Sequence, residues 1–379
     1  MNNFNNKILI LAGEASGDLH ASALVTSMLS FNKDLHFSGI AGNNMINSGV
    51  NALFHIKEMS FLGFVEVIKH LPFILEVEKK IIEHVKLNKI KFAILVDYPG
   101  FNLRIAKKLK SLGVKIAYYI SPQIWAWHQS RIKKIKNRVN KMLVVFPFEK
   151  EFYKNGNVQV EYVGHPLVER IENFNFKSKE ELFSELNIDK EILLILPGSR
   201  KHEIEKHLPE LIKTASIVSK QNELQTVVAC SDNLEVEYLQ QFIQNSEIKI
   251  VKGNTYNLLK NAKFGIVKSG TSTLEAAIIG LPFVVIYSTS KITYELGKRL
   301  VKIDFIAMPN IIAGKSVVRE FIQSEVDSNL IASFIQTLLN DNSKIENLKS
   351  ELEIIKNKLG NSGASNNAAK IIIAMLNED

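Results

Sequence analysis

The segment KSGTSTLEAAIIGLPFVVIY (residues 268–287) places small and hydroxylated residues where a predicted strand turns into a predicted helix. The first N–H groups of a helix have no partner inside the helix, and together with the helix dipole they favour an anion. The pattern therefore predicts a metal-free cradle for a nucleotide diphosphate, in which Glu275 accepts both ribose hydroxyls. Its expected members are Ser269, Gly270, Thr271, Thr273 and Glu275. A capped helix start without a ligand fits the same residues equally well.

A second junction of this kind is AGEASGDLHA (residues 12–21), which follows a predicted first strand. It matches neither G-x-G-x-x-G nor a P-loop, so it predicts neither a dinucleotide nor an ATP site. The alternative is a tight turn capped by Ser16 or Asp18. We expect a loop at the ligand-binding edge of the first domain, made of Gly13, Glu14, Ser16 and Gly17.

An acid follows another predicted strand in VDYPGFN (residues 96–102). Asp97 stands at the carboxyl end of that strand, where a carboxylate can act as a general base. The structural alternative is that Asp97 caps a helix beginning at Pro99.

The second half of the chain has a comparable junction in LPGSR (residues 196–200). The Arg200 guanidinium can bind phosphate through two hydrogen bonds, which suits a pyrophosphate leaving group held without a metal; an exposed helix-start arginine is the alternative. The following HEIEKH does not fit a zinc site, because His202 and His207 are five residues apart rather than four. No metal site is predicted. Farther along, Asn310 is expected in a turn, where its amide can hold a sugar or phosphate or simply form the turn.

Between these junctions, short apolar strands alternate with longer amphipathic helices, which indicates parallel sheets covered on both faces. A polar stretch at residues 163–182 predicts a linker, and only helical patterns follow Asp327. We therefore expect an α/β fold with two doubly wound, Rossmann-like domains facing across a cleft, followed by C-terminal helices. Strands are predicted at residues 7–12, 36–40, 92–97, 114–120, 141–146, 191–199, 225–230, 248–252, 264–269 and 283–288.

Composition fits this picture. The 379 residues suit two domains, and a net charge of +8 favours anionic partners. A single cysteine, Cys230, excludes an internal disulfide framework and fits a reducing compartment. Residues 1–12 resemble a first strand more than a signal peptide, and we find no apolar run of the roughly 18 residues needed for a spanning helix. We expect a cytoplasmic location.

Several motifs together resemble one family. LAGEASGD, SPQIWAWH (residues 121–128), FPFEKEFY (residues 146–153), GHPL (residues 164–167), LPGSR, SGTSTLE and MPNIIAG occur in a single order over nearly the whole chain. This order is similar to that of lipid-A-disaccharide synthases, glycosyltransferases of the GT-B architecture, and LAGEASGD with SPQIWAW is the most discriminating pair. The resemblance implies transfer of 2,3-diacylglucosamine from its UDP derivative to 2,3-diacylglucosamine 1-phosphate. The implied products are UDP and the β-1,6-linked disaccharide 1-phosphate of lipid A in a Gram-negative bacterium.

The resemblance also implies roles for individual residues. It makes Asp97, Arg200 and Asn310 catalytic, adds Ser199 and Asn310 to the residues that bind the UDP-sugar, and implies no cofactor and no metal. Many members of the family carry a second acid in the Asp97 turn where this chain has Gly100, which leaves Asp97 as the candidate base of that turn. The implied domains are an acceptor- and lipid-binding domain at residues 1–165, a UDP-sugar-binding domain at 166–345, and C-terminal helices at 346–379 that pack back on the first domain.

Acylated substrates would need an apolar surface. Residues 59–77 have apolar side chains at helical spacing but are too polar to span a bilayer; an ordinary buried helix is the alternative. The basic run at residues 130–141 is either a solvated helix face or a contact for anionic lipid. The predicted acyl or membrane surface consists of Phe61, Phe64, Val65, Ile68, Leu71 and Leu75.

The expected partners are thus a UDP-sugar donor, an acylated sugar-phosphate acceptor and the anionic cytoplasmic face of the inner membrane, to which the protein would bind peripherally. A monomer and a homo-oligomer both fit the sequence. A UDP-sugar 2-epimerase or a peptidoglycan-type N-acetylglucosaminyltransferase is the alternative enzyme. A basic nucleic-acid-binding protein is least favoured, because the basic residues are scattered and no nucleic-acid motif is recognisable.

Overall fold

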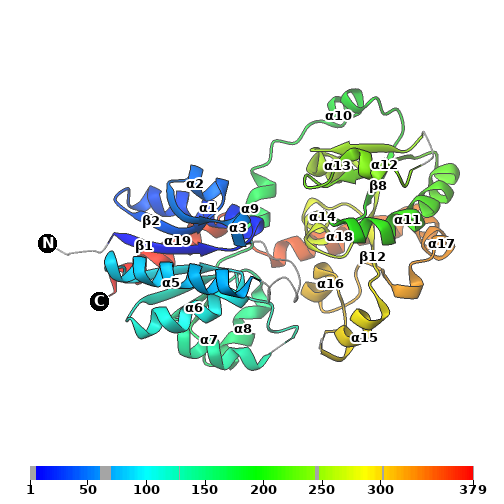
Figure 1. The fold of residues 1–379 in the computed structure, drawn as a ribbon. Helices are drawn as coiled ribbons and strands as arrows, with labels where there is room; N and C mark the ends of the chain where they lie inside the picture. Colours follow the sequence, from blue (N-terminus) through cyan, green and yellow to red (C-terminus); the bar gives the residue numbers. More distant parts are fainter. Residues whose placement is uncertain (1–5, 60–69, 128, 244–246, 301–302, 379) are drawn as a thin grey trace. The chain divides into compact units, whose positions relative to one another are not determined.

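The computed structural model describes the chain except for residues 1–5, 60–69, 128, 244–246, 301–302 and 379. The chain forms two compact units (Figure 1), one made of residues 1–169 and 361–379 and the other of residues 170–360. Each unit contains one parallel β-sheet with flanking helices. The predicted α/β fold with two Rossmann-like domains is confirmed.

The sheet of the first unit has the strand order β3-β2-β1-β4-β5-β6-β7, and all neighbouring strands are parallel. The sequence pattern predicts every one of these strands except β3 and β7. Both lie at a sheet edge and are largely half-buried, so they lack the continuous apolar run of the inner strands. The strands are β1 (Lys7–Ala12), β2 (His36–Ala41), β3 (Val50–His55), β4 (Phe92–Val96), β5 (Lys115–Tyr119), β6 (Lys141–Val144) and β7 (Val160–Tyr162).

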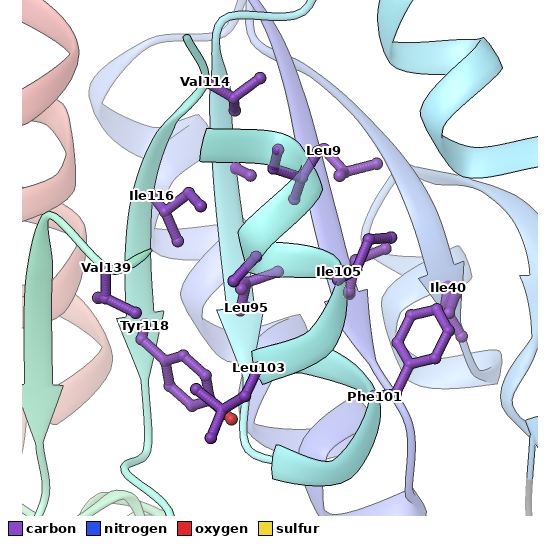
Figure 2. Packing of buried hydrophobic residues seen from close by; sticks show 14 of the residues in the cluster. Leu9, Ile40, Leu95, Phe101, Leu103, Ile105, Val114, Ile116, Tyr118 and Val139 are labelled. Carbon is purple, nitrogen blue, oxygen red and sulfur yellow. The ribbon is translucent and has the colours of Figure 1, made fainter. Parts of the chain in front are cut away.

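Helices cover both faces of this sheet. On one face, α5 (Leu71–Leu87), α6 (Pro99–Ser111) and α7 (Ile132–Arg138) share a core with alternate strand residues such as Leu9 and Leu95. Figure 2 shows α6 lying over the strands of this core, with Phe101 near Ile40 and Leu103 near Tyr118. The helix α1 (Ala15–Phe31) packs with α2 (Asn43–Asn47) and α19 (Ala364–Asn377). The remaining helices of this part are α3 (Ile56–Met59), α8 (Pro147–Asn155) and α9 (Pro166–Glu172).

The sheet of the second unit has the order β10-β9-β8-β11-β12-β13 and is also parallel throughout. Its short edge strand β13 is not predicted by the pattern. The strands are β8 (Ile192–Leu196), β9 (Gln225–Cys230), β10 (Lys249–Lys252), β11 (Phe264–Lys268), β12 (Phe283–Tyr287) and β13 (Glu320–Ile322). The helices are α10 (Lys179–Leu186), α11 (Lys201–Asn222), α12 (Val236–Gln240), α13 (Thr255–Asn261), α14 (Thr271–Ile279), α15 (Lys291–Leu300), α16 (Met308–Ala313), α17 (Ser328–Leu339) and α18 (Asn342–Lys358).

Both sheets reverse their strand order at one point, between β1 and β4 in the first unit and between β8 and β11 in the second. The loops that leave two such neighbouring strands diverge to opposite faces, which opens a crevice at their carboxyl ends. In this chain those loops are the AGEASGD and Asp97 loops in one unit, and the LPGSR and SGTSTLE loops in the other. The topology therefore brings together, within each unit, the motifs that the sequence singles out.

The C-terminal helices divide between the two units. The helix α18 packs on α14, α16 and α17 of the second unit, whereas α19 packs on α1 of the first. Residues 346–379 were expected to pack back on the first domain. They instead contribute helical residues to both units, through α18 and α19. Within the described part of the chain, no helix is long and apolar enough to cross a membrane.

Candidate active site

Asp97 lies directly after β4, beside the carboxyl end of β1. Asp97 and Tyr98 both have positive φ angles, +44° and +47°, a conformation that residues other than glycine rarely adopt. Hydrogen bonds hold this turn in place, because the Asp97 carbonyl accepts from the Asn102 amide at 2.8 Å and from the Tyr118 hydroxyl at 2.5 Å. A strained turn fixed in this way is a common feature of functional sites.

The AGEASGD loop fits closely against this turn. A Cβ atom on Gly13 would lie 2.2 Å from the Tyr98 ring, so this position requires glycine. The Tyr98 hydroxyl donates to the Met59 carbonyl at 3.0 Å, which fixes the ring over the loop. Glu14 is exposed at the N-cap of α1 and near enough to Asp97 for its charge to act on that carboxyl.

The pKa of Asp97 reflects these surroundings. Burial raises the pKa of the Asp97 carboxyl to about 6, and the charge of Glu14 adds to the rise, whereas a hydrogen bond from the Tyr98 backbone opposes it. A carboxylate with this pKa is more basic than an ordinary aspartate and is still ionised at neutral pH. Tyr98, not Asp97, occupies the N-cap position of α6. The setting of Asp97 therefore suits proton abstraction better than helix capping.

The other residues of the AGEASGD loop, Ser16, Gly17 and Asp18, differ in their exposure and in their hydrogen bonds. Ser16 is exposed in the first turn of α1, and Gly17 is buried against Ala12. The N-cap of α1 makes no side-chain hydrogen bond. The buried carboxylate of Asp18 instead accepts from the backbone N–H groups at the start of α2, including that of Gly42 at 2.7 Å. Asp18 thus joins α1 to α2 rather than capping its own helix.

Two motifs of the first unit, SPQIWAWH and FPFEKEFY, meet at Glu149. Its buried carboxylate accepts from the Ser121 hydroxyl at 2.5 Å, the Trp125 indole N–H at 3.0 Å and the Phe146 backbone at 3.1 Å. Burial raises the pKa of Glu149 to about 7, and these three donors oppose the rise. The contacts tie SPQIWAWH, which follows β5, to FPFEKEFY, which follows β6. Sequence reasoning did not identify this link.

The second unit contains a pocket of about 530 Å³ at the carboxyl ends of its central strands. Two of the predicted motifs line it together, LPGSR and the start of α14. The Arg200 side chain is 57% exposed and so is free to contact a ligand. The predicted residues that line the pocket are Ser199, Arg200, Gly270, Thr271 and Glu275.

An ion pair joins these two motifs. The Glu203 carboxylate, 9% exposed, binds the Lys268 ammonium at 2.7 Å and accepts from the Ser199 backbone N–H at 3.1 Å. Burial alone would raise the pKa of Glu203, but the hydrogen bond and charge of Lys268 outweigh it and hold the pKa below its ordinary value. Gly198 has a positive φ of +123°, and a Cβ atom there would lie 2.6 Å from the carboxylate. The carboxylate therefore fills the space beside the loop.

Glu275 is the acid of the pocket that the sequence singles out. Its carboxylate accepts from the Tyr256 hydroxyl at 3.0 Å, and the Arg170 guanidinium lies over the Tyr256 ring. Burial raises the pKa of Glu275, while Tyr256 and Arg170 oppose the rise. The Glu275 carboxylate is thus oriented on the pocket wall by the Tyr256 hydroxyl, and the Arg170 guanidinium lies over the Tyr256 ring.

Two predicted cradle residues face away from the pocket. The Ser269 hydroxyl donates to the Ile306 carbonyl at 3.1 Å, and the buried Thr273 hydroxyl donates to the Gly270 carbonyl at 2.7 Å. Neither residue lines the pocket. Their hydroxyls brace the loop from behind, so the pocket wall here consists of Gly270, Thr271 and Ser272.

The sequence predicts Asn310 in a turn, and this prediction is wrong. The residue lies in the helix α16, where it is fully buried. The preceding proline begins a helix here rather than a turn. The Asn310 amide nitrogen donates to the Val318 carbonyl and to Glu320, both at 2.8 Å. Its oxygen accepts from the backbone of Val317 and Val318 at 2.8 and 2.9 Å. Internal partners thus occupy both ends of the amide, and Asn310 does not line the pocket.

The predicted acyl surface is described only in part. Phe61, Phe64, Val65 and Ile68 lie outside the described residues. Leu71 and Leu75 stand at the start of α5 and are 42% and 49% exposed. The other side of this helix is buried in the core, so these two leucines project from the opposite side.

The structure adds residues that sequence reasoning missed. Lys268, Glu203, Tyr256, Arg170 and Asp232 line the same pocket. Lys268 and Glu203 adjoin recognised motifs, so their position was a usable signal. The others come from loops and helices without such a signal.

No arrangement suited to a metal ion is seen among the described residues, in the sense of three or more neighbouring His, Cys, Asp or Glu side chains. His207, considered above for zinc, accepts a hydrogen bond from the Ser288 backbone at 3.0 Å.

Solved structures share this architecture. A putative UDP-N-acetylglucosamine 2-epimerase from Listeria monocytogenes aligns with a TM-score of 0.67 at 10% identity, over 97% of this chain and 95% of that one. A calicheamicin glycosyltransferase aligns with a TM-score of 0.61 at 12% identity, over 98% of each chain. At these identities the likeness shows the fold alone. The class is the two-domain fold of GT-B glycosyltransferases and UDP-N-acetylglucosamine 2-epimerases.

Sequence comparison then identifies the family. The chain belongs to the lipid-A-disaccharide synthetase family, whose model matches residues 8–374. The lipid-A-disaccharide synthase of Geobacter metallireducens is 37% identical over 375 residues, 98% of each chain. That of Myxococcus xanthus is 37% identical over 373 residues, covering 98% of this chain and 97% of the relative. The resemblance inferred from the motifs is confirmed.

Proposed function

We propose that this protein is a lipid-A-disaccharide synthase that transfers 2,3-diacylglucosamine from its UDP derivative to 2,3-diacylglucosamine 1-phosphate. The observation that carries the proposal is the family match over residues 8–374, which includes both the Asp97 turn and the pocket of the second unit. The products are UDP and the β-1,6-linked disaccharide 1-phosphate. Like the relatives, the enzyme would serve lipid A biosynthesis.

In this proposal the reaction is a single displacement. Asp97 takes the proton of the acceptor's 6-hydroxyl as that oxygen attacks the anomeric carbon of the donor. The bond between that carbon and the UDP oxygen breaks on the opposite side, so the configuration inverts. The raised pKa and strained turn of Asp97 support its role as the base.

The pocket of the second unit would bind the UDP part of the donor. Glu275, oriented by Tyr256, accepts the ribose hydroxyls, while Arg200 and the N-terminus of α14 face the pyrophosphate. Negative charge grows on the β-phosphate as UDP leaves, and these groups stabilise it. The residues present thus supply phosphate-binding groups of their own, which supports catalysis without a metal.

We further propose that the protein works at an anionic membrane surface, where acylated substrates reside. Leu71 and Leu75 at the start of α5 and Trp127 after β5 are exposed, and all three belong to the first unit. The helix α7, which follows Trp127 in the chain and packs on α6, carries exposed Lys133, Lys134 and Lys136. Exposed apolar side chains and exposed lysines in the same unit suit peripheral binding to anionic lipid.

The test is UDP release from two donors, UDP-2,3-diacylglucosamine and UDP-N-acetylglucosamine, each with and without 2,3-diacylglucosamine 1-phosphate in detergent micelles. We expect release only from the acylated donor with the acceptor present, together with the disaccharide by mass spectrometry. Release from UDP-N-acetylglucosamine at a similar rate, or its epimerisation without an acceptor, would overturn the proposal in favour of another GT-B enzyme.

A further inference from the structure

Lys268 stands at the end of β11, immediately before the SGTSTLE loop. Its side chain is 17% exposed and its ammonium lies over the Tyr287 ring. A Cβ atom on Gly270 would be 3.9 Å from that ammonium, which places the charge beside the start of α14. The lysine also lines the pocket of the second unit. A cation is therefore present where the proposed function needs one.

The ammonium is held in this position by Glu203. The carboxylate binds Lys268 through one oxygen and the Ser199 N–H through the other, and the Arg200 guanidinium lies 3.9 Å away. One buried acid thus holds Lys268 at the end of β11 and lies within ion-pair distance of Arg200. The ammonium has three donors and can keep its bond to Glu203 while donating to a ligand.

We infer that Lys268 is a second pyrophosphate-binding cation that acts beside Arg200, with Glu203 as the residue that positions it. This inference rests on the proposed function, because it assumes that the pocket binds a nucleoside diphosphate. It adds to that function a specific contact for the phosphate groups, distinct from the ribose contact of Glu275. Lys268 would then favour diphosphates over nucleosides and monophosphates.

A series of three ligands separates this role from a structural one. Binding of uridine, UMP and UDP is measured by calorimetry for the wild type and for Lys268→Met. If the ammonium contacts the pyrophosphate, we expect UDP to bind roughly tenfold or more weakly to the variant, with uridine changed less than about twofold. Lys268→Arg should restore most of the UDP affinity, because it keeps the charge.

Lys263 offers a matched control, since it is an exposed lysine just before the other end of β11. Lys263→Met should bind all three ligands as the wild type does. Because Lys268→Met leaves the Glu203 carboxylate buried without its cation, the double variant Glu203→Gln/Lys268→Met is measured as well, with melting temperatures for both. The double variant should show the same loss confined to the phosphorylated ligands.

Two outcomes would overturn the inference. One is an equal loss for uridine and UDP in a folded Lys268→Met protein, which would make the lysine structural. The other is unchanged UDP binding in that variant while the wild type prefers UDP to uridine, which would leave the proposed function intact. Failure of the wild type to release UDP from the acylated donor would instead reject the proposed function itself.

Discussion

The Asn310 amide donates to the Glu320 carboxylate at 2.8 Å, and the same carboxylate accepts from the backbone N–H groups of Ile306 and Ala307. The Ile306 carbonyl in turn accepts from the Ser269 hydroxyl at the start of the pocket loop. Asn310 is thereby linked to the loop through Glu320 and Ile306 rather than by facing a ligand. We propose that this link gives Asn310 a positioning role, whereas the catalytic role implied by the family stays a prediction.

Asn310→Ala tests that role. The change removes hydrogen bonds at both ends of a fully buried amide, so we expect a loss of stability of about 2–4 kcal/mol as well as a loss of activity. Thermal unfolding measures the first and UDP release the second. A variant that melts like the wild type but has lost turnover would instead point to direct contact with substrate.

Replacement of Asp97 by Asn should nearly abolish turnover. The amide keeps the size of the side chain but cannot accept the proton, so we expect kcat to fall by ~10²–10⁴ while UDP binding is retained. Single-turnover assays and calorimetry measure the two properties separately. Near-normal turnover would remove Asp97 from the mechanism.

The pH dependence of the wild type should follow from the raised pKa of Asp97. Because the ionised form is the base, kcat/KM should fall as the pH drops through about 6. Glu14→Gln removes the neighbouring charge that contributes to the rise, so the inflection should move to lower pH. Identical profiles for both proteins would show that Glu14 does not act on the Asp97 carboxyl.

Stability should show the opposite trend. A raised pKa means that the folded protein binds this proton more tightly than the unfolded chain, so ionised Asp97 lowers stability above pH 6, and the deficit vanishes as the pH falls toward about 4. Asp97→Asn should therefore be more stable than the wild type at pH 8, by on the order of 2 kcal/mol. The difference should shrink at pH 4.5. Urea unfolding at both values provides the measurement.

Arg200→Ala and Glu275→Ala should differ in their kinetics. Both should weaken UDP binding, but only Arg200→Ala should mainly lower kcat, because the guanidinium meets charge that grows in the transition state. Rates measured with EDTA should equal those without it. Activity lost on chelation and restored by Mg²⁺ or Mn²⁺ would contradict a metal-free pocket.

The membrane proposal can be tested on α5 alone. Leu71→Ser with Leu75→Ser should reduce co-sedimentation with vesicles that contain anionic lipid, while the melting temperature changes little, since both leucines are exposed. Leu87→Ser is the control, because that leucine is 84% exposed at the far end of the same helix. Equal vesicle binding by all three proteins would argue against this surface.

The inner strands of both sheets were predictable because a strand buried on both faces is a continuous apolar run. The junctions after these strands were predictable as sites because ligands bind at the carboxyl ends of strands in such folds. Three strands at sheet edges, β3, β7 and β13, lack that signal, although the edge strand β10 shows it. The contact between Lys268 and Glu203 joins residues that are 65 positions apart. The hydrogen bonds of Asn310 were not predictable either. Its polar amide suggested contact with a ligand, and only the structure reveals that the amide is buried and bonded to backbone groups.

The packing of α19 on α1 has a consequence for the order of synthesis. Residues 361–379 belong to the first unit but are translated after all of residues 170–360. On the ribosome, the unit that begins first is therefore completed last, and the side of α1 that packs on α19 stays uncovered while the second unit emerges and folds. A stalled or prematurely terminated chain would expose that side of α1 even though its Asp97 turn had already been made.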